Sequence, residues 1–191
     1  KSGGSGLKKN KHFLDEALFE DFLNRLSPIG KQIDSLIFQF EYLNQEKMSG
    51  LLPFLSCLKD FFKRCPAGFR YCIETRNKNY LTPLYFNTLM EMGLYHVFLQ
   101  GYWMPPVYKL YYQYQEMIRD FTVIRLHGPD RKKIEQTTRK RWHKAVIHRD
   151  NELKMIKKMV DKLSERQVEV TVSVNNHYEG SAPETIRRFL D

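Results

Sequence analysis

The sequence predicts an α/β fold built on parallel strands, on three observations. Short apolar segments alternate regularly with amphipathic helical segments, which is the order produced by parallel strands joined through helical crossovers. Polar side chains follow the apolar segments where the predicted strands end, at the edge where parallel sheets bind ligands. The 191 residues, 42% hydrophobic and 14% aromatic, can bury one substantial core. We therefore expect one domain over residues 13–191, preceded by a flexible, linker-like start at residues 1–12 that includes GGSG.

One helix and three strands are indicated first. Leu14, Leu18 and Phe22 recur at helical spacing across residues 13–26, and SPIG ends that helix. Short apolar segments typical of buried strands follow at SLIFQF, FRYCIET and LYHVFL.

Two further helices separate these strands. One carries an apolar stripe from Leu51 to Phe62 and ends at RCPAG. The other has Thr82 as its cap, Pro83 in its first turn and Gly93 just past its end, which is the expected order of cap, proline and terminal glycine.

The second half continues the alternation. A loop followed by a short helix is predicted for GYWMPPVYKLYYQYQ, and FTVIRL is the fourth strand. The strongly basic segment DRKKIEQTTRKRWHK and a helix from about Glu152 to Glu165 lead to VEVTVSV, the fifth strand. Ser181 and Glu184 have the S-x-x-E spacing of a capping box at the start of a last helix.

Together, four segments resemble a known family. SLIFQF, YCIETR, VIRLHGPD and VSVNNHYEGSAPETI are similar, in order and spacing, to the YecE-like family, a domain of unknown function (number 72). The resemblance covers residues 13–191 and implies a TIM-barrel-like fold in which these are the last five of eight strands. The first three strands are then either missing from this sequence or supplied by another chain. The family's reaction is unsettled, so function has to be argued from the site.

Carboxylate, guanidinium and imidazole groups at the strand ends are the candidate chemical groups. Glu74 and Arg76 are two residues apart and share one face of a strand, so they either pair or hold a proton-transfer carboxylate beside a phosphate. Arg125 and His127 repeat this spacing. The candidate catalytic residues are Glu74, His127 and His177, and the candidate ligand-binding residues are Gln39, Arg76, Arg125, Asn175, Asn176 and Glu179.

The segment after the fifth strand adds two expectations. Asn175 and His177 are expected to share one face of the strand, and the helix that starts at Ser181 offers free N–H groups to an anion. Glu179 is instead a base or a metal ligand. A divalent metal is an alternative occupant, with Glu74, His127, His177 and Glu179 as ligands from different strands. The motifs GxGxxG, GxxxxGK and GxSxG are absent from the sequence, which gives no support to dinucleotide, P-loop or α/β-hydrolase chemistry.

The net charge of +9 and the pI near 9.4 favour polyanionic partners. Residues 131–144 hold most of this excess, and seven of them form a predicted nucleic-acid rim: Arg131, Lys132, Lys133, Arg139, Lys140, Arg141 and Lys144. The leading hypothesis is a barrel protein that binds, and in one version hydrolyses, a phosphate-containing ligand such as nucleic acid. The alternatives are a non-catalytic nucleic-acid or protein-binding module and a metal-dependent enzyme similar to sugar isomerases.

The cellular location is also predicted from composition. Cys57, Cys65 and Cys72 are odd in number and lack CxxC spacing, which fits a reducing cytoplasm better than a disulfide framework. No apolar run approaches the ~20 residues of a membrane helix, so no membrane partner is expected.

Overall fold

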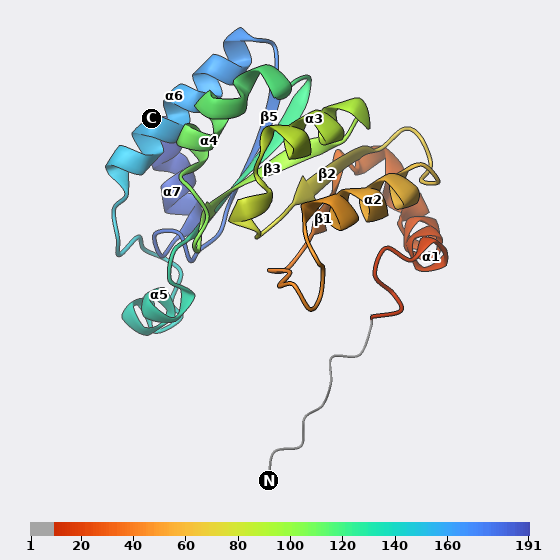
Figure 1. The fold of residues 1–191 in the computed structure, drawn as a ribbon. Helices are drawn as coiled ribbons and strands as arrows, with labels where there is room; N and C mark the ends of the chain where they lie inside the picture. Colours follow the sequence, from red (N-terminus) through yellow and green to blue (C-terminus); the bar gives the residue numbers. More distant parts are fainter. Residues whose placement is uncertain (1–9) are drawn as a thin grey trace.

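A curled sheet of five parallel strands organises the molecule (Figure 1). The computed structural model describes residues 10–191, so the start predicted for residues 1–12 lies outside the described residues except for 10–12, which lead into a turn. The strands are β1 (Ser35–Gln39), β2 (Arg70–Glu74), β3 (Tyr95–Gly101), β4 (Phe121–Gly128) and β5 (Glu169–Val174). Their order in the sheet follows the chain, and each neighbouring pair is parallel.

Helices precede, connect and follow the strands, which confirms the predicted α/β class. They are α1 (Glu16–Leu26), α2 (Leu51–Phe62), α3 (Pro83–Glu91), α4 (Val107–Tyr114), α5 (Arg131–Thr138), α6 (Asp150–Glu165) and α7 (Ala182–Leu190). Short 3-10 turns occupy Ser27–Gln32, Lys78–Tyr80 and Gln115–Met117. Among the described residues, no helix is both long and apolar enough to cross a lipid bilayer.

The two faces of the sheet carry different side chains because successive residues of a strand point to opposite sides. The outer face is covered by helices, and side chains such as Phe98, Ile124 and Leu126 form the main core there. On the inner face a smaller buried cluster is formed by Cys72, Val97, Phe121 and Val123. The inner face is more polar at β5, where Glu169, Thr171 and Ser173 are exposed.

Two side-chain bridges across the inner face show how strongly the sheet curls. Arg125 of β4 donates to Gln39 of β1 at 2.9 Å, although β2 and β3 lie between them. At the opposite edge Arg70 of β2 bonds Glu169 of β5 at 2.6 Å, and it also bonds Asp34 at 2.9 Å. Strands three apart in a flat sheet would be separated by roughly 14 Å. The five strands therefore form a half-barrel.

Several predicted features of the helices are confirmed and two are wrong. Thr82 caps α3, and the loop followed by a short helix appears as α4. The first helix, predicted from Phe13, begins at Glu16 because the Asp15 side chain accepts the N–H of Leu18 and caps it there.

The predicted capping box at the last helix does not form. Ser181 makes no side-chain capping bond. The carboxylate of Glu184 instead accepts the N–H of Ala145 at 2.6 Å, and the Asn176 side chain accepts the N–H of Ala182 at 2.8 Å. Distant loop groups have replaced the local partner that the S-x-x-E spacing predicts.

Two glycines let the ends of β3, β4 and β5 approach one another closely. A Cβ placed on Gly101 would lie 2.4 Å from the carbonyl oxygen of Gly128, and a Cβ on Gly128 would lie 2.5 Å from that of His177. Both glycines have positive φ, +140° and +77°. The segment that carries His177 is therefore held against the end of β4 by backbone contact.

We expect Gly128→Ala to destabilise the protein more than Gly93→Ala. Both positions have positive φ, which costs an L-residue ~1–2 kcal/mol, but a Cβ on Gly93 meets nothing within 4 Å. The clash with the carbonyl of His177 should therefore increase the loss of stability by about 1 to 3 kcal/mol further, at Gly128 only. Urea unfolding measures both free energies, and equal losses for the two variants would contradict the close approach.

Candidate functional site

A single carboxylate shared by two arginines lies at the C-terminal edge of the sheet. Glu74, the last residue of β2, is fully buried. Its Oε2 accepts a hydrogen bond from Nη1 of Arg125, and its Oε1 lies 3.6 Å from Nε of Arg76. Gln39 joins from β1 through its bond to Arg125. The structure thus brings together Gln39, Glu74, Arg76 and Arg125, with one more guanidinium than carboxylate.

Arg76 uses less of its hydrogen-bonding capacity than Arg125. The 3.6 Å between its Nε and Glu74 exceeds an ordinary hydrogen bond, and both atoms are buried without a partner among the described residues. Buried polar atoms are normally paired. The guanidinium carbon of Arg76 lies 4.8 Å from the ring centroid of Tyr102, in the loop after β3. The aromatic ring positions the guanidinium and leaves donors free.

His127 extends the cluster along β4. It lies two residues after Arg125, where the register between β3 and β4 shifts by one residue, and its ring centroid is 5.9 Å from that of Tyr102. Burial lowers the pKa of His127 from 6.5 to about 4, helped by the positive charges of Arg125 and Arg76 and by a smaller electrostatic contribution from His177. The imidazole is therefore neutral near pH 7, inside a region of positive potential.

His177 is tied to the basic helix α5. Its Nε2 lies 3.1 Å from Oε1 of Glu135, and the Trp142 ring packs edge-on at 5.1 Å between centroids. A hydrogen bond from Arg131 lowers the pKa of Glu135, with a smaller contribution from His177. Glu135 and Trp142 were not predicted as site residues. The one available signal was that Glu135 is the single acid within residues 131–144.

The other predicted ligand-binding residues are engaged elsewhere. The strand ends at Val174, so Asn175 and His177 do not share a strand face as expected. The side chain of Asn175 accepts the N–H of His177, and that of Asn176 accepts the N–H of Ala182. The predicted anion site at the start of the last helix is thus partly filled by an amide oxygen from the chain itself.

Glu179 is buried in a separate polar network beneath α7. It accepts the N–H of Arg149 at 2.5 Å, the hydroxyl of Thr185 at 2.8 Å and the guanidinium of Arg188 at 2.6 Å. These contacts join α6 and α7 to the segment after β5 and give Glu179 a structural position. The four side chains expected to hold a divalent metal do not assemble. Within residues 10–191, no group of three or more His, Cys, Asp or Glu residues could hold a metal ion.

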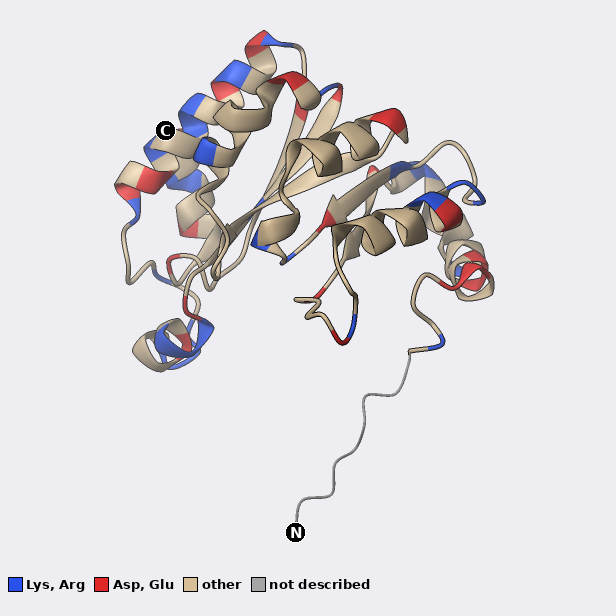
Figure 2. Ribbon diagram, viewed as in Figure 1, with Lys and Arg blue, Asp and Glu red and all other residues tan. Residues whose placement is uncertain are grey.

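The predicted nucleic-acid rim lies on and just after α5, which projects from the body of the sheet (Figure 2). All seven of its Lys and Arg residues are exposed. Arg131 pairs with Glu135 at 2.7 Å, and it is the only one of the seven with an acidic partner in the described part of the chain. The rim is therefore an exposed cationic surface connected to the strand-end cluster through Glu135 and His177.

Comparison with known proteins gives the family. A protein-family model described as a protein of unknown function, DUF72, matches residues 5–191. This chain belongs to the DUF72 family. No curated protein matches it.

Two crystal structures of DUF72 family proteins have a similar fold. The protein from Thermotoga maritima MSB8 has a TM-score of 0.63 at 18% identity, with 92% of this chain and 63% of that chain covered. The protein from Enterococcus faecalis V583 has a TM-score of 0.61 at 19% identity, with 93% and 69% covered. The DUF72 chain described here thus spans about two thirds of each relative.

We expect Glu74→Gln to lower the free energy of unfolding by about 3 kcal/mol, because it leaves Arg125 without its buried counter-charge. Glu165→Gln is the matched control, since Glu165 forms an ion pair with Lys162 in which both side chains are more than half exposed; such pairs contribute ~0–1 kcal/mol. Urea unfolding of both variants measures the difference. A loss at Glu74 no larger than at Glu165 would show that the central carboxylate does not hold the strand ends together.

Proposed function

We propose that the C-terminal edge of this DUF72 half-barrel binds a phosphate-bearing ligand at Arg76, Arg125 and His127. The supporting observation is that two guanidinium groups share the one carboxylate of Glu74. That carboxylate balances one positive charge and leaves the other uncompensated. A guanidinium is suited to phosphate because its planar donors match two phosphate oxygens at once.

His127 supports an anionic ligand on electrostatic grounds. Its pKa is lowered in part by Arg125 and Arg76, which means that these groups create a positive potential at the imidazole. An anion bound beside it would offset that potential and favour the protonated ring. Protonated His127 would then add a charged donor to the ligand.

Nucleic acid is the ligand class that the wider surface favours. The seven basic residues of the rim follow β4 directly, and His177 connects them to the strand ends through Glu135. A phosphodiester backbone carries regularly spaced charges that could contact the rim while one phosphate occupies the cluster.

The arrangement supports binding more strongly than hydrolysis. Glu74 is enclosed with Arg125, and His177 is engaged with Glu135. His127 is then the one candidate catalytic group available as a general base, and its low pKa makes it a weak one. A non-catalytic binding module is therefore our preferred version, while a sugar isomerase-like reaction lacks a clustered set of metal ligands among residues 10–191.

The location of the cluster fits a TIM-barrel-like fold, which we include in the proposal. Parallel strands in sequential order with strong curvature are the pattern of the last five strands of such a barrel. In that fold, ligands bind at the C-terminal ends of the strands, where Glu74, Arg76, Arg125 and His127 lie.

We expect inorganic phosphate to raise the pKa of His127 from about 4 by roughly 1 to 3 pH units, as an opposite charge at close range does. Phosphate affinity should therefore increase as the pH falls through the raised value. Titration of the His127 ring by NMR, with and without phosphate, measures both effects. Arg76→Gln should weaken them, whereas Arg70→Gln, at the opposite edge of the sheet, should not. If the pKa of His127 does not change at saturating phosphate, phosphate does not bind at Arg76, Arg125 and His127.

We expect binding of a single-stranded oligonucleotide to weaken with salt and to depend on α5. The double variant Lys132→Gln, Lys133→Gln should reduce the slope of log affinity against log salt by about 1.4, at ~0.7 per phosphate contact. The double variant Lys154→Gln, Lys158→Gln makes the same charge change at exposed positions on α6. Equal effects of the two double variants would indicate a response to net charge and not to the rim.

A further inference from the structure

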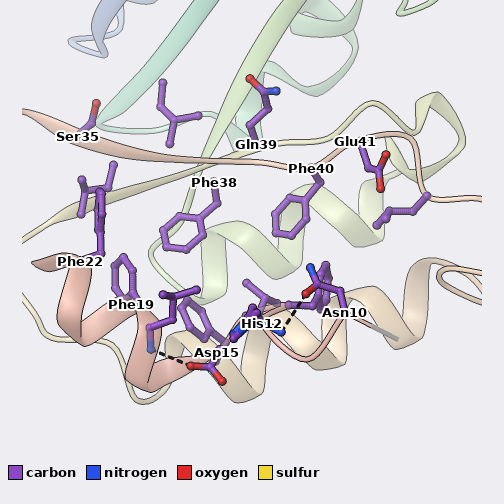
Figure 3. A pocket seen from close by; sticks show the side chains of 17 residues that line it. Asn10, His12, Asp15, Phe19, Phe22, Ser35, Phe38, Gln39, Phe40 and Glu41 are labelled. Carbon is purple, nitrogen blue, oxygen red and sulfur yellow. Dashed lines mark hydrogen bonds between the residues drawn. The ribbon is translucent and has the colours of Figure 1, made fainter. Parts of the chain in front are cut away.

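Trp103, in the loop between β3 and α4, is an aromatic side chain that the fold leaves open to solvent. Its exposed fraction is 86%, the highest of any large apolar side chain in the described part of the molecule. The apolar groove between α1 and β1 differs, because the rings of Phe19 and Phe38 pack there with centroids 5.2 Å apart (Figure 3). The most exposed large apolar side chain on its walls is Leu18, at 50%. A buried tryptophan stabilises a fold strongly, and Trp103 makes no such contribution.

The backbone of the loop holds Trp103 in a defined place. The N–H of Met104 donates to the carbonyl of Gly101 at 3.2 Å and closes a four-residue turn. The N–H of Tyr102 donates to the carbonyl of Gly128, at the end of β4, also at 3.2 Å. The side chain of Met104 packs against the main core. Trp103 therefore lies at the corner of a turn that is anchored on both sides.

Tyr102 adopts a backbone conformation that is unusual for a residue of its size. Its φ of +53° lies in the left-handed region, and turn positions with positive φ are normally occupied by Gly, Asn or Asp. A bulky residue there is strained, and such strain is concentrated at functional sites. In this conformation the Tyr102 ring lies 4.8 Å from the guanidinium carbon of Arg76 and 5.9 Å from the ring of His127. The turn thus directs Tyr102 onto the strand-end cluster and leaves the adjacent Trp103 in solvent.

Trp103 is also close to the basic rim. Its Cα is about 3.8 Å from that of Tyr102, as across any trans peptide. The pKa of Arg131, the first residue of the rim, is raised mainly by its hydrogen bond with Glu135, and Tyr102 makes a smaller electrostatic contribution. Tyr102 therefore lies near Arg131 as well as Arg76. The exposed indole is adjacent to a point where the cluster and the rim approach each other.

Stacking on a nucleobase is the chemistry that this combination of groups suits. Proteins that bind single strands combine a positively charged track for the backbone with aromatic rings on which bases stack. In a duplex the faces of the bases are covered by their neighbours, whereas unpaired bases can be splayed onto a side chain. A neutral sugar could also stack on an indole, but it would leave the excess positive charge of Arg76 and Arg125 unmatched.

We propose that Trp103 is a stacking platform for an unpaired base, and that the ligand of the strand-end cluster is therefore a single-stranded nucleic acid. This inference rests on the proposed function, because the cluster and the rim supply the phosphate contacts. The base would lie on the exposed indole while a neighbouring phosphate binds Arg76 and Arg125. Stacking tolerates any base, so we expect little preference for sequence.

The test compares three ligands of equal length: a single-stranded oligodeoxynucleotide, the same backbone with abasic sites in place of all bases, and a blunt duplex. Trp103→Ala should weaken binding of the intact strand by about 5- to 150-fold, the range for one stacked base. The slope of log affinity against log salt should stay the same, because stacking releases no counterions. Binding of the abasic strand and of the duplex should not change.

Two further variants separate stacking from damage to the fold. Trp103→Phe keeps an aromatic face and should retain most of the affinity for the intact strand. Tyr112→Ala removes another exposed aromatic ring, on α4, and should leave binding unchanged. Because Trp103 is almost fully exposed, Trp103→Ala should unfold at the same urea concentration as the unaltered protein.

Each other outcome overturns the inference. If the intact strand binds with the expected salt dependence and Trp103→Ala binds it equally well, the phosphate-binding proposal stands and stacking does not occur. An equal loss of affinity for the abasic strand or for the duplex would show that Trp103 does not contact an unpaired base. If no strand binds the unaltered protein, the nucleic-acid proposal and this inference fail together. If the protein sediments as a dimer and Trp103→Ala as a monomer, Trp103 instead contacts a second copy.

Discussion

The buried carboxylate of Glu74 is the interaction on which the C-terminal edge of the sheet depends. Through Arg125 it connects β2 to β4, and through the bond of Arg125 to Gln39 it reaches β1. An isolated buried charge would be costly, so the three side chains fix one another. Because the bridge crosses the inner face of the curled sheet, it also holds Arg125 where its charge acts on His127.

Backbone contacts also fix the position of the segments that carry the remaining site residues. The close approach of Gly128 to His177 holds the turn after β5 against β4. His177 in turn contacts Glu135, whose carboxylate also pairs with Arg131. The cluster and the exposed basic rim are therefore connected through a short series of direct contacts, although they differ in burial and in chemistry.

The sequence predicts the elements better than the site. Apolar periodicity locates the strands, and local caps such as Thr82 are found because their partners are near in sequence. The pairing of Glu184 with Ala145 and of His177 with Glu135 spans 39 and 42 residues, and nothing local indicates it. The i, i+2 spacing predicts that Arg125 and His127 share one face, but it cannot show that curvature brings Gln39 to Arg125. For Asn175 and His177 the same spacing misleads, because the strand has already ended.

The bridge from Arg70 to Glu169 at the opposite edge has a consequence for the shape of the sheet. Together with the bridge from Arg125 to Gln39, it joins strands three apart at both ends of the sheet, so the bend is held by contacts within this chain. The side chains of the inner face therefore keep their spacing at both ends of the strands. Any ligand of the strand-end cluster would therefore meet side chains that are already positioned, which reduces the ordering cost of binding.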